Sequence, residues 1–421
     1  MTSRWPEDAL GINGLGRIGK LTVWHHVARG NFPAIVVNVG RSVGLGLEAV
    51  CSVIERDSTY GAMHRFLFGV GAEPAIRIVD RDAGLLDVAG TPVTILQEAR
   101  NPHDIEWKRH GVRVVVDATG AFLDPAAPAD SPNGSLRGHL ASGADVVINS
   151  AAFKAKDKSA SPPEDAVTLI HGINQDAFDP VRHQLISAAS CTTTAVAHML
   201  KPLLDALGAA TIMTASMSTV HAATNSQSVL DTLPASGARD QRKSRSALNS
   251  IILTSTNAAA ALELVLPEIG QIGFMADSVR VPVQAVSLAV LNVTFQSRML
   301  DDGTSNIRRR VINKVYSEAA SGAQQGDLVF TEEQNVPADI SGMRAAVVIE
   351  GSETHTRTGF VNVDLRSLPG LDAAVVEALP TKHIDVPVTH AKVFGWYDNE
   401  YGSYTNFLGD LTVHIHESLN A

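Results

Sequence analysis

The chain has 421 residues, of which 45% are hydrophobic, and its formal net charge is −10. This length predicts two domains with sizeable cores, and the acidic balance argues against a general role on nucleic acid or at a membrane surface. Its two cysteines, Cys51 and Cys191, form no CxxC pair, so neither a disulfide framework nor a structural zinc site is predicted. The sequence has no long apolar span, so we expect a cytoplasmic protein. We also expect no bound metal ion.

Short β runs alternate with helical patterns through the first 190 residues. Helices are predicted over residues 16–28 and 45–55. The β runs are Leu10–Asn13, Ala34–Val39, Ala75–Val79, Val93–Leu96, Arg113–Ala118, Asp145–Asn149, Thr168–Ile170 and Leu185–Ala188. Such alternation predicts βαβ units and a mostly parallel, Rossmann-type sheet.

A GxGxxG motif follows the first predicted strand, with Gly14, Gly16 and Gly19 at its fixed positions. Glycines at these positions let the backbone approach a pyrophosphate, and the helix start that follows supplies N–H groups and positive potential. The motif therefore predicts a dinucleotide site, against the alternative of a glycine-rich turn without a ligand.

The end of the second predicted strand indicates which dinucleotide is bound. A carboxylate that binds the ribose is expected there, but the sequence reads Asn38-Val39-Gly40-Arg41. Without that acid a 2′-phosphate is not repelled, and Arg41 is placed to pair with it. The strand end therefore favours NADP over NAD, unless Arg41 simply faces solvent.

Cys191 lies among small hydroxyl residues where a β run gives way to an amphipathic helix over residues 195–207, which Pro202 should bend. A cysteine at a helix N-terminus is expected to have a stabilised thiolate, the nucleophilic form. The alternative is a buried structural cysteine.

After residue 208 the β runs are longer, and helices are expected to back the sheet that they form. The runs are Thr211–Val220, Val283–Phe295, Ala345–Glu350 and Phe360–Leu365, with a helix predicted near Ile307–Ala320. They predict an α+β domain with a mostly antiparallel sheet. His221 ends the first run and could act as a base for Cys191, or be structural. Arg280 stands within an apolar run and needs an anion, a salt bridge or a subunit contact.

With these motifs in order, the chain resembles the glyceraldehyde-3-phosphate dehydrogenase family. The matching segments are GINGLGRIG, EARNPHDIEW, DATGAF, SAASCTT, TVHAATN, NSQSVLD, RSALNSIILTST, VRVPV and WYDNEYG. The resemblance is strong to about residue 296 and again from about residue 390, whereas residues 297–390 match poorly.

The resemblance implies a role for each matching residue. Cys191 would be the nucleophile and His221 its base. Arg17 and Ile18 would contact the cofactor phosphates, Arg100 and Thr119 would flank its adenosine and nicotinamide parts, and Asn399 would hold its carboxamide. Thr224 and Arg280 would bind the substrate phosphate, and Ser190, Thr192, Thr256 and Asn257 the second phosphate.

The resemblance further implies a dinucleotide-binding domain over residues 1–190, joined by a C-terminal helix over about 400–421, and a catalytic domain over 191–399. A homotetramer is expected, with the loop Asp231–Ser250 packed against the cofactor across an interface. The expected reaction oxidises a small phosphorylated aldehyde, glyceraldehyde 3-phosphate, with inorganic phosphate, through a thioester.

Several positions depart from the family pattern, among them Ala188, Thr194, Ala223, Leu253 and Asn257. Those near Asn257 keep the first of two alternatives open, and the second is a different class of protein. One is an erythrose-4-phosphate-type dehydrogenase in which water resolves the thioester. The other is a nucleotide-binding scaffold without turnover.

Overall fold

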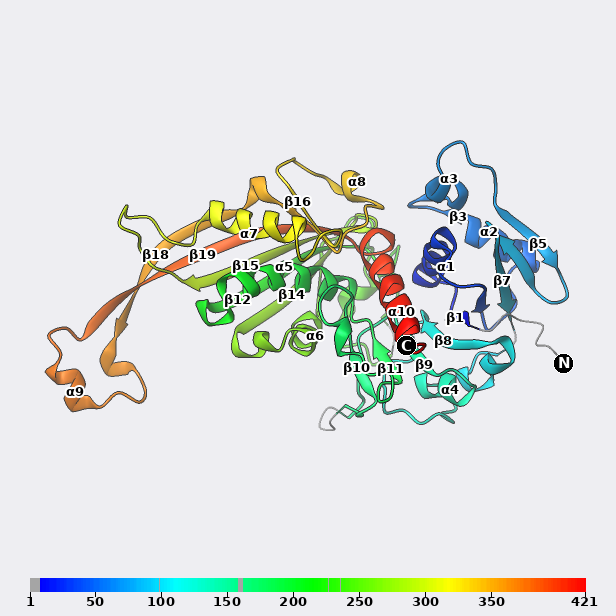
Figure 1. Cartoon of the computed structure of the whole chain (residues 1–421), viewed down its shortest axis with the longest axis horizontal. Coiled ribbons are helices and arrows are strands. Elements are labelled where there is room, and N and C mark those ends of the chain that lie inside the picture. Colours follow the sequence, from blue (N-terminus) through cyan, green and yellow to red (C-terminus); the bar gives the residue numbers. More distant parts are fainter. Residues whose placement is uncertain (1–7, 98, 158–161, 226, 235) are drawn as a thin grey trace.

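The computed structural model describes residues 8–421 except 98, 158–161, 226 and 235. Two sheets organise these residues, one near each end of the molecule (Figure 1). The predicted α/β class, a Rossmann domain followed by an α+β domain, is confirmed.

The first sheet has nine strands in the order β10-β11-β9-β8-β1-β2-β7-β6-β5. They are β1 (Ala9–Asn13), β2 (Ile35–Asn38), β5 (Ile76–Asp80), β6 (Leu85–Val88), β7 (Thr91–Leu96), β8 (Val112–Asp117), β9 (Val146–Asn149), β10 (Ala166–Thr168) and β11 (Leu185–Ser187). All neighbouring strands from β10 to β7 run parallel, and β6 and β5 add an antiparallel edge. The buried, valine-rich strands are typical of a parallel sheet covered on both faces.

Helices cover the two faces of this sheet. They are α1 (Arg17–Arg29), α2 (Leu47–Glu55), α3 (Met63–Phe68), α4 (Leu136–Ala141) and α10 (Asn406–Ser418). Side chains of α1, α2, α3 and α10 share one apolar core with the sheet, and α4 packs on the opposite face with Trp107. The last helix of the chain therefore returns to the first sheet (Figure 1). A short hairpin, β3 (Arg56–Asp57) and β4 (Gly61–Ala62), follows α2.

The second sheet has eight strands, ordered β13-β14-β12-β15-β19-β17-β16, with β18 paired to β19. They are β12 (Ile212–Ala222), β13 (Ile252–Thr254), β14 (Gly273–Val281), β15 (Val286–Gln296), β16 (Leu328–Thr331), β17 (Val347–Glu350), β18 (His355–Asp364) and β19 (His383–Asp398). Most neighbours are antiparallel, but β12–β14 and β16–β17 are parallel.

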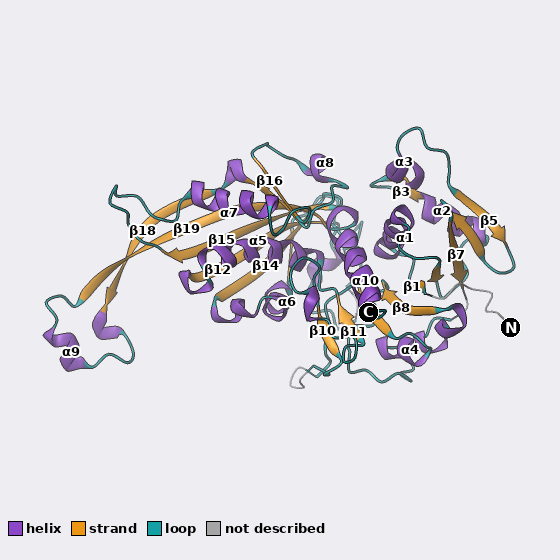
Figure 2. Cartoon of the chain, in the orientation of Figure 1, coloured by secondary structure: helices purple, strands orange, loops and turns teal. Residues whose placement is uncertain are grey.

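One face of this second sheet carries the helices α5 (Cys191–Leu207), α6 (Ala258–Val265) and α7 (Arg309–Ser321), which share its apolar core (Figure 2). Two shorter helices, α8 (Pro337–Ile340) and α9 (Ala373–Ala378), lie in the later connections. Pro202 is accommodated inside α5. The sequence-based division at residues 190 and 191 falls where β11 turns into α5.

Candidate active site

The turn that precedes α5 sets the position of the cysteine. Ala189 adopts a left-handed φ of 53°, and Ser190 then caps the helix by accepting a hydrogen bond from the Thr193 backbone N–H at 3.2 Å. Cys191 is therefore the first residue of α5, at the end of the helix where backbone N–H groups are unpaired. The prediction that it lies at a helix N-terminus is confirmed.

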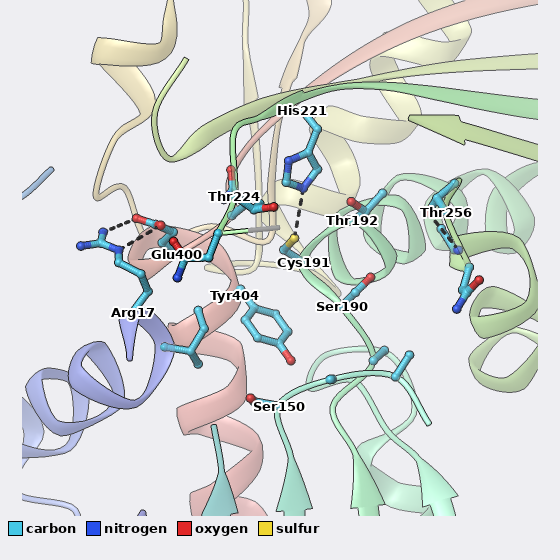
Figure 3. Close-up of a pocket in the computed structure, with 18 of the residues that line it drawn as sticks. Arg17, Ser150, Ser190, Cys191, Thr192, His221, Thr224, Thr256, Glu400 and Tyr404 are labelled. Carbon is cyan, nitrogen blue, oxygen red and sulfur yellow. Dashed lines mark hydrogen bonds and ion pairs between the residues drawn. The ribbon is translucent and has the colours of Figure 1, made fainter. Parts of the chain in front are cut away.

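His221 lies near the end of β12, with its ring directed at the cysteine (Figure 3). Its Nε2 is 3.6 Å from Cys191 Sγ, and its Nδ1 is 2.7 Å from the Ala222 carbonyl oxygen. The carbonyl can only accept, so Nδ1 donates and Nε2 is left to accept a proton from the thiol. The parallel register of β12 and β14 places Arg280 opposite this histidine.

Burial and charge act together on this pair. Burial, and then the Arg280 charge, lower the pKa of His221 to about 4, so its ring is a neutral acceptor at pH 7. Burial also raises the pKa of the Cys191 thiol, although Arg280 and hydrogen bonds around Thr192 oppose this rise. The expected stabilised thiolate is therefore wrong for the resting chain, because desolvation outweighs the helix N-terminus.

These two side chains face a cavity of about 610 Å³ between the two sheets. It brings together eleven of the residues singled out from the sequence. They are Arg17, Ile18, Ser190, Cys191, Thr192, His221, Thr224, Thr256, Asn257, Arg280 and Asn399. Its walls also contain residues that sequence reasoning did not place there, including Ser150, Lys154, Lys243, Glu400 and Tyr404 (Figure 3).

The cationic side of the cavity suits an anion. Arg280 Nη1 donates to the Ala222 carbonyl oxygen at 3.4 Å, and burial lowers the pKa of its guanidinium. Lys154 and Lys243 add two further ammonium groups to the wall, and neither makes an ion pair within the described residues. Thr224 donates its backbone N–H and its hydroxyl to Gln227 Oε1, at 2.9 and 3.0 Å.

The hydroxyl groups expected at a second phosphate also make hydrogen bonds within the chain. Ser190 Oγ caps α5, and Thr256 Oγ1 accepts from the Ala258 N–H at 3.2 Å. Thr192 Oγ1 lies 2.9 Å from the Tyr397 hydroxyl, which also contacts Thr219 Oγ1 at 2.7 Å. This buried tyrosine was not predicted, although its place in the WYDNEYG segment was a signal.

The glycine motif has the shape that a dinucleotide pyrophosphate requires. Gly14 has a left-handed φ of 97°, and a Cβ on Gly19 would lie 1.9 Å from the Gly14 carbonyl oxygen. A Cβ on Gly16 would meet nothing within 4 Å, so open space borders the start of α1 at this position. The strand–turn–helix geometry therefore fits the cofactor predicted from the motif.

The Arg17 side chain is engaged elsewhere. Its Nε donates to Glu400 Oε1 at 3.0 Å, and its Nη groups pair with Asp57 and Glu400. These two carboxylates raise the pKa of the guanidinium even though burial opposes the effect. For the predicted phosphate contact, the backbone N–H groups of Arg17 and Ile18 at the helix start are therefore better candidates than the guanidinium.

The remaining nucleotide residues surround the ends of the parallel strands. Arg100 Nε donates to the Gly40 carbonyl oxygen at 3.3 Å, and Thr119 Oγ1 donates to Asp117 Oδ1 at 2.6 Å. Asn399 Oδ1 accepts from Ser287 Oγ at 2.9 Å, which orients the side-chain amide at the cavity wall. Arg41 is exposed after β2 and makes no ion pair with any described residue.

No group of three or more histidine, cysteine, aspartate or glutamate side chains within the described residues is arranged to hold a metal ion. None of the helices they form is both long and apolar enough to cross a membrane.

Comparison with known proteins gives two family matches. Residues 9–125 match the glyceraldehyde 3-phosphate dehydrogenase NAD binding domain, and residues 190–365 match the C-terminal domain of the same family. The glyceraldehyde-3-phosphate dehydrogenase of Streptomyces coelicolor is 33% identical over 412 residues, which span 97% of this chain and 99% of that protein. Glyceraldehyde-3-phosphate dehydrogenase 1 of Bacillus subtilis is 31% identical over 407 residues, spanning 96% and 97%.

The two family matches fall on the two sheets, and the NAD-binding match contains the glycine motif and the start of α1. The chain therefore binds a nicotinamide dinucleotide and is an oxidoreductase. It belongs to the glyceraldehyde-3-phosphate dehydrogenase family.

Proposed function

We propose that this chain oxidises glyceraldehyde 3-phosphate, with inorganic phosphate, to 1,3-bisphosphoglycerate. The observation that carries the proposal is the 3.6 Å approach of Cys191 Sγ to His221 Nε2 inside a cavity lined by Arg280. A thiol beside a neutral imidazole forms a nucleophile at the moment of attack, and the guanidinium attracts a substrate phosphate. The relatives named above carry this activity in their names.

The chemistry follows from these groups. As the sulfur attacks the aldehyde carbon, the thiol proton passes to His221 Nε2 and from there to the former carbonyl oxygen, so that a hemithioacetal forms on Cys191 and Nε2 is again free to accept a proton. The bound nicotinamide ring supplies the hydride acceptor. His221 removes the hydroxyl proton of the hemithioacetal, which leaves a thioester on the sulfur. Phosphate then attacks the thioester carbon, and the Cys191 thiolate departs with release of the acyl phosphate.

The test is a spectrophotometric assay with each nicotinamide cofactor, with and without phosphate. Cys191→Ser should abolish turnover, and His221→Asn should lower kcat by about 100-fold or more. Cys51→Ser serves as the matched control, because Cys51 lies on α2 outside the cavity and should keep wild-type activity. Full activity in Cys191→Ser would refute the proposal, whereas a wild type that shows no turnover with either cofactor would favour the nucleotide-binding scaffold.

A second candidate is an erythrose-4-phosphate-type dehydrogenase in which water resolves the thioester. The Thr192 hydroxyl supports it, because its contact with the buried Tyr397 hydroxyl leaves one fewer group for a second phosphate. Asn257, also in the wall, adds a neutral amide in place of the small residue of the family pattern. Turnover on erythrose 4-phosphate that does not depend on inorganic phosphate would establish this alternative.

We also propose that NADP is preferred over NAD. The support is the strand end of β2, where Val39 stands instead of an acid and the exposed Arg41 has no ion-pair partner within the described residues. A Val39→Asp, Arg41→Ala double variant should shift the kcat/KM ratio toward NAD. Arg298→Ala, which removes an exposed guanidinium beyond the end of β15 in the second sheet, is the control. An unchanged ratio in the double variant would contradict this proposal.

We propose, finally, that the protein is a homotetramer. The loop Asp231–Ser250, within which residue 235 lies outside the described residues, presents Leu233 and Leu248 to solvent in a single chain. Exposed apolar side chains concentrated in one segment are typical of an interface. Sedimentation velocity should give a four-chain particle, and a Leu233→Glu, Leu248→Glu double variant should give a smaller one. A monomeric wild-type protein would refute the assembly.

A further inference from the structure

Arg17 joins three segments that are far apart in the sequence. It is the first residue of α1, and its Nε donates to Glu400 Oε1 at 3.0 Å (Figure 3). Its Nη groups pair with Asp57 and again with Glu400. Asp57 lies in the β3–β4 hairpin, and Glu400 lies just beyond the end of β19. One guanidinium therefore ties the start of α1 to this hairpin and to the turn after β19.

The two carboxylate partners are themselves held in place. Asp57 Oδ2 lies 2.7 Å from the Lys20 ammonium, and Asp57 Oδ1 accepts the Tyr60 backbone N–H at 3.0 Å. The Tyr60 hydroxyl donates to Asp398 Oδ1 at 2.7 Å, and the same oxygen accepts the Glu400 backbone N–H at 2.9 Å. The hairpin and the turn are therefore linked twice, once through the guanidinium and once through the tyrosine.

The charges in this network cancel. Arg17 and Lys20 supply two positive charges, and Asp57 and Glu400 supply two negative ones. Because carboxylates already neutralise the guanidinium, it has little attraction left for a cofactor phosphate. An ion pair at this exposure also adds little to folding stability, since the Arg17 side chain is 27% exposed and the Glu400 side chain 18%. Neither phosphate attraction nor stability accounts for the pair.

The pair lies between the two ends of the cofactor site. The start of α1, with the backbone N–H groups of Arg17 and Ile18, is the expected site of the cofactor pyrophosphate. Asn399, next to Glu400, is expected to hold the nicotinamide carboxamide, and its backbone N–H donates to the Ala285 carbonyl oxygen at 2.7 Å. Arg17, Asn399 and Glu400 all line the same cavity. The ion pair therefore connects the residues that bound the two ends.

We propose that the Arg17–Glu400 ion pair is a positioning element of the cofactor site, which fixes the distance between its pyrophosphate end and its nicotinamide end. A dinucleotide bound at one end binds at the other only if the spacing is right, so a fixed spacing raises its affinity without any new contact. ADP-ribose lacks the nicotinamide ring and gains nothing from the spacing. The inference rests on the proposed placement of the cofactor, and it gives neither residue a part in the chemical step.

Calorimetric titration of two ligands tests the inference. One is NADP or NAD, whichever the wild type binds more tightly, and the other is the matching ADP-ribose, with or without its 2′-phosphate. Glu400→Gln removes one charge at nearly constant volume, and should weaken the dinucleotide by about 5-fold or more while ADP-ribose affinity stays nearly unchanged. Arg17→Met should also weaken the dinucleotide. The double variant should match Arg17→Met within about twofold, because both changes break the same interaction.

The sign of the Glu400→Gln effect separates this role from a direct contact. If the Arg17 guanidinium bound the pyrophosphate, removing the competing carboxylate would strengthen both ligands. The proposal is overturned by a tighter dinucleotide, by additive losses in the double variant, or by an equal loss for both ligands in a variant that melts as the wild type does. Arg17→Lys is a second probe, because it keeps the charge but one ammonium cannot replace the contacts with both carboxylates. It should weaken the dinucleotide and spare ADP-ribose.

The ion pair between Arg344 and Asp410 is the matched control. Its Nη2–Oδ2 distance is 2.7 Å, its side chains are 38% and 19% exposed, and neither of them lines the cavity. Arg344→Met and Asp410→Asn should leave the ratio of the two affinities at the wild-type value, and an equal change in that ratio would also overturn the proposal. The titrations contain no aldehyde. A wild type without turnover would therefore refute the proposed function and leave these expected affinities standing.

Discussion

Acid should destabilise this protein through imidazoles that are buried in the neutral form. His26 on α1 lies beside Phe32, with ring centroids 5.0 Å apart, and burial lowers its pKa to about 3. Burial likewise lowers the pKa of His198 on α5 to about 4. Because the folded-state pKa lies below the unfolded value of about 6.5, the unfolded chain binds more protons. The stability that depends on these two imidazoles being neutral is fully present above pH 6.5, and the free energy of unfolding falls as the pH is lowered from 6.5 toward 3.

The magnitude follows from these values. For a group with a pKa of about 3 when folded and about 6.5 when unfolded, lowering the pH from 7 to 5 removes about 2 kcal/mol of unfolding free energy. His198 contributes a similar loss over the same range. A typical protein has only about 5–15 kcal/mol in total, so these two side chains are a substantial part of the acid sensitivity.

The assay is urea unfolding at a series of pH values between 5 and 7.5, on the wild type and on His26→Leu. Leucine has nearly the same volume and does not titrate, so the drop in unfolding free energy from pH 7 to pH 5 should be about 2 kcal/mol smaller in the variant. Val27→Ala is the control, since Val27 is buried on the same helix and carries no ionisable group, so the drop between pH 7 and pH 5 should be unchanged. Equal drops in wild type and His26→Leu would refute the reasoning.

Three further outcomes follow from the site. Tyr397→Phe leaves the buried Thr192 hydroxyl without its partner and should lower the unfolding free energy by about 1–3 kcal/mol, measured by urea titration. Gly19→Ala forces a methyl group against the Gly14 carbonyl oxygen, so cofactor affinity, measured by fluorescence titration, should fall. Arg280→Leu should raise KM for the phosphorylated aldehyde by about 10-fold or more, with a smaller effect on an aldehyde that lacks phosphate.

The first sheet could be predicted well because its signals are local. The glycine motif fixes the first strand and α1, and the structure places them at Ala9–Asn13 and Arg17–Arg29. Strand β6, which lies beside the edge strand β5, and the 16-residue β19 were missed. Apolar and polar residues alternate irregularly along β19, and part of the strand is exposed. It is therefore stabilised by pairing with its neighbouring strands more than by the local preference of its residues.

The candidate site was predictable in composition but not in geometry. Cys191 and His221 each end a local pattern, and both could be named from the sequence. The ion pairs that occupy Arg17 could not, because Glu400 comes from the far end of the chain. The raised pKa of the Cys191 thiol could not be predicted from the sequence either. It is caused by burial, which depends on the packing of both domains around the sulfur.

The return of α10 to the first sheet means that the nucleotide-binding half is not built from the first half of the chain alone. Tyr401, Leu408 and Ile415 complete the same apolar core as Trp24 on α1. In a fragment ending at residue 190, the apolar surface that α10 covers would be exposed to solvent. Such a fragment should be recovered in soluble form only when residues 400–421 are supplied as a second peptide. The core of the nucleotide-binding half therefore stays incomplete until the segment 400–421 has been synthesised.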